Sequence, residues 1–190
     1  MRMRNLFAMV ILITLAGGAV AQDSKQIAEP GVYRFTETVD FKEDKWDLHA
    51  KLVITTKAFN PTLHKIIRGR PQEDAVGRSI QRIDAKMPLG VRDAPPLVEI
   101  TNFVVDFDGV SVTVPKSLYG DCFNPRFDEE SFGTKFSDNG KSLLIFMAGG
   151  AEKNLYQVIW IIRKDGLHSR FINNCSDCDY KGLVSFLKKK

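Results

Sequence analysis

The chain of 190 residues contains only three cysteines, and this scarcity excludes one class of small exported protein. A fold that depends on a disulfide framework needs many paired cysteines. Cys122, Cys175 and Cys178 can form at most one internal disulfide, which leaves one thiol free, buried or paired with another chain. A hydrophobic core must therefore hold this fold together.

Long apolar runs and a strong net charge are also missing beyond the first 21 residues. A membrane-spanning helix needs about 20 consecutive apolar residues, and no later segment has them. The formal net charge is +4, and it falls to +2 without Arg2 and Arg4. A dedicated nucleic-acid binder needs a concentrated basic face. We therefore expect neither a transmembrane segment in the mature chain nor a nucleic-acid partner.

Recognisable catalytic and metal-binding motifs are absent as well. The sequence has neither the HExxH pattern of zinc proteases nor a GxSxG nucleophile elbow. Its carboxylates do not follow the spacing of a calcium-binding loop. The three histidines, His49, His64 and His168, are widely separated along the chain. We expect no cofactor and no metal site, and the sequence identifies no catalytic residue.

What the sequence does contain is an export signal at its start. Residues 2–4 carry two arginines, residues 6–15 form an apolar core, and small residues over 17–21 suit a cleavage site after Ala21. Because the next residue is Gln22 and not a cysteine, we expect no lipid anchor. The mature protein is then secreted or periplasmic, in a compartment where disulfides persist.

The remaining sequence suits one domain with short flanking segments. After a signal peptide over 1–21, we expect a polar leader over 22–31, a single β-rich domain over 32–187 and a basic tail over 188–190. The length of the central segment is in the usual range for one domain.

Alternating apolar and polar residues predict strands along most of the chain. Two such runs, 32–41 and 48–54, flank a charged segment and predict a hairpin. A second hairpin is expected over 97–114, where Asp108-Gly109 suits the positive φ values of a type I′ turn. Further strands are expected over 132–136, 141–148, 155–163 and 167–172, with a last strand or helical turn over 183–187.

Two segments determine the predicted fold class. Residues 158–162 are apolar on both faces, which is typical of a central strand covered on both sides. Residues 72–86 predict one short helix, because Pro71 suits the first helical position and an apolar stripe follows it. That stripe consists of Val76, Ile80, Ile83 and Met87. The fold is therefore expected to be mainly β, either an antiparallel β-sandwich or a β-rich α+β domain.

Cys175 and Cys178 form a CxxC pair that could serve three roles. A redox dithiol needs a helix start that lowers the thiol pKa, and no such pattern surrounds the pair. A zinc site could combine the pair with Cys122 and His168, but a second paired ligand turn is missing. A disulfide between Cys122 and Cys175, or alternatively Cys178, suits an oxidising compartment, and it is the role we predict.

The loop over 119–130 is the predicted functional surface. It combines turn formers, aromatics, acids and an arginine, and binding groups concentrate on loops above a rigid sheet. Outside this loop, Trp46 lies beside a charged turn, where an exposed indole would suit a glycan or a protein. The binding candidates are Trp46, Tyr119, Asp121 and Arg126.

These observations favour a non-catalytic exported module that binds a protein or glycan ligand or associates with the cell envelope. The alternative is a small exported hydrolase with a site near His168 and the 119–130 loop. An exposed aromatic patch without converging ionisable groups would favour the binding module. His168 within hydrogen-bond distance of a carboxylate and a nucleophile would favour the hydrolase.

Overall fold

The structure is a computed structural model, and its strands occupy most of the described chain. It describes residues 26–29, 32–43, 46–69, 79–137, 139–150, 154–166 and 168–173. These residues form eleven β-strands and two short 3-10 helices, and none of them is in an α-helix. The predicted signal peptide, the segment 183–187 and the basic tail lie outside the described residues.

The first sheet has five antiparallel strands in the order β1-β2-β3-β6-β7. Its strands are β1 (Gln26–Glu29), β2 (Val32–Glu43), β3 (Trp46–Ala58), β6 (Val98–Phe107) and β7 (Val110–Thr113). β2 pairs with β3 from end to end, as the first predicted hairpin requires. In the second predicted hairpin, Asp108 has φ 48° and Gly109 has φ 85°. Both hairpins are confirmed.

The second sheet is a four-stranded antiparallel meander with the order β11-β10-β9-β8. Its strands are β8 (Phe132–Phe136), β9 (Ser142–Gly149), β10 (Tyr156–Arg163) and β11 (His168–Asn173). These bounds agree closely with the four strands predicted from alternation. The apolar strand β10 lies inside the sheet, between β9 and β11.

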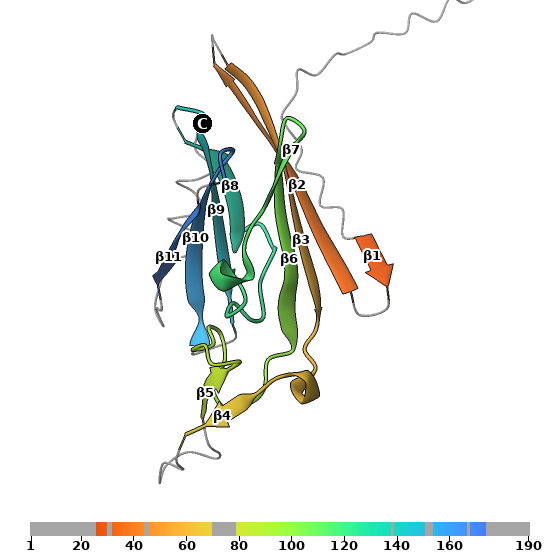
Figure 1. The fold of residues 1–190 in the computed structure, drawn as a ribbon, viewed down its shortest axis with the longest axis vertical. Coiled ribbons are helices and arrows are strands. Elements are labelled where there is room, and N and C mark those ends of the chain that lie inside the picture. Colours follow the sequence, from red (N-terminus) through yellow and green to blue (C-terminus); the bar gives the residue numbers. More distant parts are fainter. Residues whose placement is uncertain are drawn as a thin grey trace, which may run out of the picture.

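The two sheets pack face to face as a β-sandwich (Figure 1). Side chains at alternate positions point inward, because successive residues of a strand face opposite sides. Trp160 of β10 is fully buried and meets Phe103 of β6 edge to face, with ring centroids 5.1 Å apart. Its indole Nε1 donates to the Leu118 carbonyl oxygen at 2.8 Å, so the buried N–H is satisfied. The mainly β, sandwich-like prediction is confirmed.

A small two-stranded sheet extends one end of the sandwich (Figure 1). It consists of β4 (Ile66–Arg68) and β5 (Ile80–Ile83), and the short helix η1 (Pro61–Leu63) precedes it. The second short helix, η2 (Lys116–Leu118), follows β7. A separate apolar cluster joins this small sheet to the main body through Phe59 and Phe123.

The predicted helix over 72–86 is wrong where the structure describes it. Residues 80–83 form β5, and residues 71–78 lie outside the described part of the chain. Ile80 and Ile83 are buried as expected, but against Phe59 and Phe123 rather than along a helical stripe. The chain then turns at Asp84, whose φ of 50° is incompatible with a right-handed helix. Two apolar residues three positions apart suit either structure.

The predicted polar leader also contains a strand that alternation did not reveal. Residues 26–29 form β1, which pairs with the start of β2. Its mixed sequence QIAE carries no period-two signal, so only the long neighbouring strand makes this pairing possible. Among the described residues, no helix is long and apolar enough to cross a membrane.

Candidate functional site

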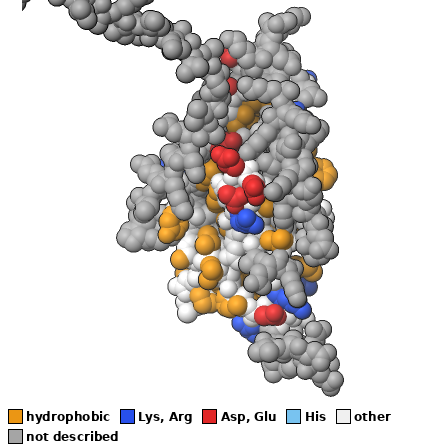
Figure 2. All heavy atoms as spheres, turned by 180° about the vertical axis from the view of Figure 1, so that it is seen from behind, with side chains coloured by type: hydrophobic (Ala, Val, Ile, Leu, Met, Phe, Trp, Pro, Cys, Tyr) orange, Lys and Arg blue, Asp and Glu red, His pale blue; other side chains and the backbone are white. Residues whose placement is uncertain are grey.

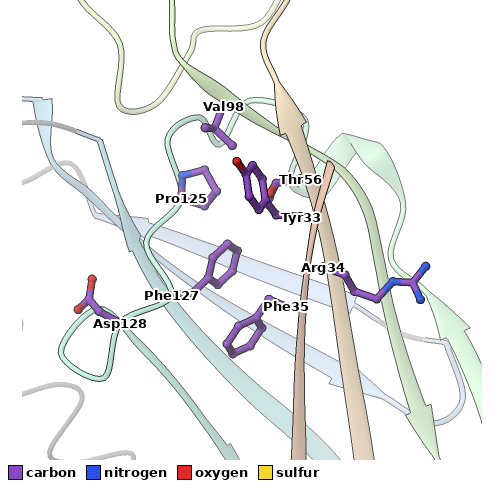
Figure 3. Close-up of a pocket in the computed structure, with 8 residues that line it drawn as sticks. All are labelled: Tyr33, Arg34, Phe35, Thr56, Val98, Pro125, Phe127 and Asp128. Atoms are coloured by element: carbon purple, nitrogen blue, oxygen red, sulfur yellow. The ribbon is translucent and has the colours of Figure 1, made fainter. Parts of the chain in front are cut away.

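A cleft of about 420 Å³ opens between the first sheet and the loop that leads into β8 (Figure 3). Three strands of the first sheet and the loop over 124–131 contribute side chains to its wall. The lining consists of Tyr33, Arg34, Phe35, Thr56, Val98, Pro125, Phe127 and Asp128. We call this feature the aromatic cleft.

Two phenylalanine rings line the aromatic cleft, and a third, buried ring packs against them. Phe35 of β2 stacks on Phe127 of the loop, with ring centroids 4.7 Å apart and planes 14° from parallel. Phe132 of β8 meets Phe35 edge to face at 4.6 Å. Aromatic pairs with these geometries contribute about 0.5–1.5 kcal/mol each beyond the area they bury. The cluster therefore ties the first sheet to the loop and leaves part of two rings accessible.

Apolar groups face the aromatic cleft, while its two charged groups lie at the margin. Tyr33, Phe35 and Phe127 gather around the open space (Figure 3). The Arg34 side chain points to the other side of β2, as alternation along a strand requires (Figure 3). Tyr33 remains 39% exposed, so an aromatic surface is accessible from solvent.

Asn124 fixes the loop that carries Phe127. Its side-chain oxygen accepts hydrogen bonds from the backbone N–H groups of Leu97 at 2.8 Å and Val98 at 3.1 Å, where β6 begins. Its backbone oxygen accepts from the N–H of Gly150, which follows β9. Asn124 itself adopts a positive φ of 50°, which asparagine tolerates better than most residues. One residue thus connects the loop to both sheets.

The next two residues extend this connection along the edge of the second sheet. Pro125 forms an isolated bridge with Gly149, and the N–H of Arg126 donates to the Ala148 carbonyl oxygen at 3.0 Å. A wall held by backbone hydrogen bonds on both sides is largely preformed. Preformed sites bind with a smaller loss of conformational entropy.

Asp128 is held in its charged form at the margin of the cleft. Burial alone would raise the pKa of Asp128, but the Ser131 hydrogen bond, the Arg126 charge and the Glu130 N–H outweigh it and lower that pKa. The Arg126 Nε and an Asp128 carboxylate oxygen lie 3.3 Å apart. Both side chains are nearly half exposed, so this ion pair contributes little to stability.

Charges of both signs occur together on the molecular surface. In the view from behind, acidic side chains gather near the middle of the face, with a basic side chain directly beside them (Figure 2). Hydrophobic side chains of described residues are scattered over the lower part of the same face (Figure 2). Accessible apolar groups are thus a feature of this surface.

Two of the four predicted binding residues lie inside the protein. Tyr119 is 4% exposed, packs near Phe103 and donates through its hydroxyl to the Thr101 carbonyl oxygen at 3.3 Å. Asp121 is 8% exposed, and its carboxylate pairs with Arg170 of β11. Neither side chain faces the aromatic cleft, so burial argues against direct contact with a ligand.

The Asp121–Arg170 pair connects the loop after η2 to the last strand. The Arg170 guanidinium donates to both Asp121 carboxylate oxygens, at 2.5 and 3.0 Å, and to the Leu118 carbonyl oxygen at 3.0 Å. Burial alone would lower the pKa of Arg170, but Asp121 raises it above its usual value. The bidentate geometry explains how a partly buried charge is tolerated here.

The other two predicted binding residues have different surroundings. Arg126 is exposed beside the aromatic cleft and pairs with Asp128, which lines it. The side chain of Trp46 lies outside the described part of the structure. The 119–130 loop as a whole contributes Pro125, Phe127 and Asp128 to the cleft wall.

Cys122 is a free and fully buried cysteine in the structure. Burial, assisted by the nearby Asp121 carboxylate, raises the pKa of its thiol well above the usual range. Such a thiol is a poor nucleophile at neutral pH. Cys175 and Cys178 lie outside the described residues, so the disulfide to Cys122 is not seen and stays a prediction.

His168, the centre of the alternative hydrolase site, has no catalytic partners in the described structure. Its Nε2 atom is buried and has no hydrogen-bond partner. Within the described residues, no group of three or more metal-binding side chains is close enough to hold an ion. The other two histidines do contact carboxylates. His64 has Nδ1 2.7 Å from Asp84 and Nε2 3.4 Å from Glu99, and the exposed His49 has Nδ1 2.7 Å from Asp40.

Tyr33, Phe35 and Val98 line the candidate site although the sequence does not point to them. Tyr33 and Phe35 alternate with polar residues, which is the ordinary signature of a strand face buried in a core. The position of the loop over 124–131 decides that they line an open cleft instead. The sequence feature that could indicate the loop position is the turn-forming pair Asn124-Pro125. The residues that this pair contacts are distant in sequence, so the pair alone does not reveal the position.

Comparisons of the chain with protein-family models, with curated proteins and with solved structures found no match. Function therefore has to be inferred from the geometry of the described residues.

Proposed function

We propose that this protein is a non-catalytic exported binding protein and that its ligand occupies the aromatic cleft. The observation that carries the proposal is the stack of Phe35 on Phe127 beside the partly exposed Tyr33, all three lining the cleft between the first sheet and the loop over 124–131. Aromatic rings that remain accessible at a preformed concave surface are typical of ligand-binding sites.

The chemistry of the lining favours an apolar or aromatic ligand group, such as an aromatic side chain of a peptide. Phe35, Phe127, Val98 and Pro125 offer carbon surfaces and no side-chain hydrogen bond. Thr56 and Tyr33 are the neutral lining residues with a side-chain hydroxyl, and Thr56 is only 4% exposed. A glycan would require several such groups to replace its bonds to water.

The arrangement of charged groups supports binding rather than catalysis. Arg34 points away from the space, and Asp128 is bonded to Arg126 and Glu130 of its own loop. General acid–base catalysis requires an ionisable group within hydrogen-bond reach of the reacting atoms. No second charged side chain joins Asp128 on the ligand side of the described lining.

The proposed location outside the cytoplasm rests on the sequence. Residues 6–15 have the length and composition of a signal-peptide core, and Ala21 suits the cleavage site. Secretion or transport to the periplasm would bring the cleft into contact with extracytoplasmic peptides or proteins. The N-terminal residue of the exported protein tests this part directly, and a chain that keeps Met1 and stays in the cytosol would overturn it.

The binding proposal can be tested by NMR titration with N-acetyl-tryptophanamide and, in parallel, with methyl β-D-glucopyranoside. We expect the indole compound to shift resonances of Tyr33, Phe35 and Phe127 saturably. About 18 non-hydrogen atoms at roughly 0.3 kcal/mol each correspond to a dissociation constant of about 0.1 mM. We expect the glucoside to cause no saturable shift.

A pair of variants assigns the binding to the cleft. Phe127→Ala removes half of the aromatic stack and should weaken binding by about tenfold, the equivalent of roughly 1.4 kcal/mol. Phe171→Ala is the matched control, because Phe171 is a 60% exposed aromatic residue on β11 of the second sheet. Equal binding by both variants, or no saturable shift with the indole compound, would overturn the proposal.

A further inference from the structure

The outer face of the second sheet is apolar and buried on β9, although its described hydrophobic neighbours all belong to the same sheet. Phe146 and Ala148 of β9 are both 0% exposed. They do not belong to the core between the sheets but form a separate cluster, against which the partly buried Leu144 and Ile159 pack. All four are on the second sheet itself, so no described hydrophobic residue of another element belongs to this cluster.

Strand register places a continuous apolar row on this outer face. Phe146 pairs with Gly133 of β8 on one side and with Ile159 of β10 on the other. Ile159 in turn pairs with Phe171 of β11. Directly paired residues of neighbouring strands project to the same face. The row therefore crosses all four strands, and we call it the outer apolar row.

Burial along the outer apolar row is uneven. Phe146 is fully buried, Ile159 is partly buried and Phe171 is 60% exposed. Gln157, next to Ala148 on the same face, is only 6% exposed although it is polar. Burial on this face is thus greatest on β9, near the end of the sheet that holds Ala148 and Gln157, and decreases toward β11.

We propose that this face is the docking site of the chain's own C-terminal segment, residues 174–190. The last described residue, Asn173, pairs with Gln157 and so lies at the end of the sheet where burial is greatest. The distance from β11 to β9 is two strand spacings, or about 10 Å. Four extended residues can span it, and this segment has many more.

The sequence of the segment matches an apolar surface. Tyr180, Leu183, Val184 and Leu187 recur at positions i, i+3, i+4 and i+7, the spacing of one face of an amphipathic helix. Lys181 and Ser185 fall on the opposite side of that pattern. A sheet that is apolar on both faces requires a cover on each of them. The first sheet covers the inner face, and the stripe over 180–187 suits the outer one.

Covering this face also prevents self-association. Contiguous exposed apolar surface on a monomer promotes association or aggregation, and the outer apolar row would supply such a surface across four strands. The proposal therefore predicts that loss of this contact exposes an apolar surface prone to self-association. The sandwich itself should stay folded, because the core between the sheets does not include the C-terminal segment.

Photo-cross-linking on the full chain tests the contact directly. The photoreactive residue p-benzoylphenylalanine replaces Phe171, which lies at the rim of the outer apolar row, and mass spectrometry locates the cross-link. We expect cross-links to residues 180–187 of the same molecule. The same photoreactive residue at Tyr33, on the first sheet, is the control and should give none to that segment. Cross-links from position 171 to residues 1–21, to residues 151–153 or to a second molecule would overturn the proposal.

Two charge-matched substitutions provide an independent measurement. Leu183→Asp places a carboxylate in the apolar stripe, and Ser185→Asp adds the same charge on its opposite side. We expect Leu183→Asp to increase binding of the dye 8-anilinonaphthalene-1-sulfonate several-fold and to produce dimers in light scattering, with Ser185→Asp unchanged. Equal behaviour of the two variants would refute the docking site, and the cross-link decides the matter if Leu183→Asp fails to fold.

Discussion

The two sheets of this sandwich obey the same alternation, yet their outer faces differ. In the first sheet, exposed or half-exposed side chains such as Lys51, Asn102 and Asp106 face outward. In the second sheet, Phe146 and Ala148 occupy the equivalent outward positions and are fully buried. The comparison shows that alternation fixes which residues share a face, whereas composition decides whether that face needs a cover.

The largest expected effect comes from truncating the buried outer face. Phe146→Ala should lower the free energy of unfolding by about 3–5 kcal/mol, as for other fully buried phenylalanines. Val104→Ala, on the half-exposed outer face of the first sheet, should cost about 1 kcal/mol at most. Urea denaturation of both variants measures the difference. Equal losses of unfolding free energy in the two variants would mean that the outer faces of the two sheets contribute equally to stability.

The next effect compares two ion pairs of the second sheet. Arg170→Ala leaves the Asp121 carboxylate buried without its partner, and we expect a loss of roughly 2–4 kcal/mol. Arg163→Ala breaks the half-exposed pair with Asp165 and should cost less than about 1 kcal/mol. Thermal unfolding followed by circular dichroism provides the measurement. A small loss for Arg170→Ala would show that water reaches Asp121.

Two glycines, one in each sheet, are required for different reasons. Gly149 lacks space for a side chain, whereas Gly109 adopts a backbone conformation that other residues rarely adopt. A methyl group at Gly149, at the end of β9, would collide with the Tyr156 ring and hydroxyl, so Gly149→Ala should cost about 1–3 kcal/mol. Gly109 in the β6–β7 turn has open space but a φ of 85°, so Gly109→Ala should cost about 1 kcal/mol through backbone strain alone. Measured in a Tyr156→Ala background, which removes the ring, the loss from Gly149→Ala should be smaller, and the loss from Gly109→Ala should be unchanged.

The smallest effect concerns acid stability beside the small sheet of β4 and β5. The hydrogen bond from His64 lowers the pKa of Asp84, and this effect is larger than the opposing effect of burial. Because the folded pKa is below the unfolded one, Asp84 stabilises the fold at neutral pH, and this contribution disappears as pH falls through that lower pKa. The side chain is 50% exposed, so the contribution is below about 1 kcal/mol.

A comparison of pH profiles measures this contribution. Asp84→Asn should flatten the loss of stability below about pH 4, near the ordinary pKa of aspartate, while leaving the profile above pH 8 unchanged. An unchanged acid limb would show that the contact between His64 and Asp84 does not stabilise the fold.

Most of the fold could be predicted because its signals are local. The Asp108-Gly109 turn adopts the two positive φ values that its sequence suits, and the strands of the second sheet follow from alternation. The helix over 72–86 failed because the partner of β5 is the three-residue strand β4, which has no pattern of its own. Short strands depend on tertiary packing, here on Phe59 and Phe123.

The candidate site was harder to predict because long-range contacts create it. The sequence singled out the 119–130 loop as the functional surface, and Phe127 and Asp128 of that loop line the cleft. It could not show that Tyr119 turns into the core or that Asp121 meets Arg170, nearly fifty residues away. Local propensity contains no information about such partners.

The bonds of Asn124 to both sheets have a consequence for the kinetics of ligand exchange. The loop backbone at Asn124 cannot move away without breaking hydrogen bonds at the start of β6 and beyond the end of β9. On the proposed function, a ligand would enter a cleft that is already open, and association should proceed at the usual rate for rigid partners, about 10⁵–10⁷ M⁻¹s⁻¹. Differences in affinity among ligands would then reside in how long each one stays.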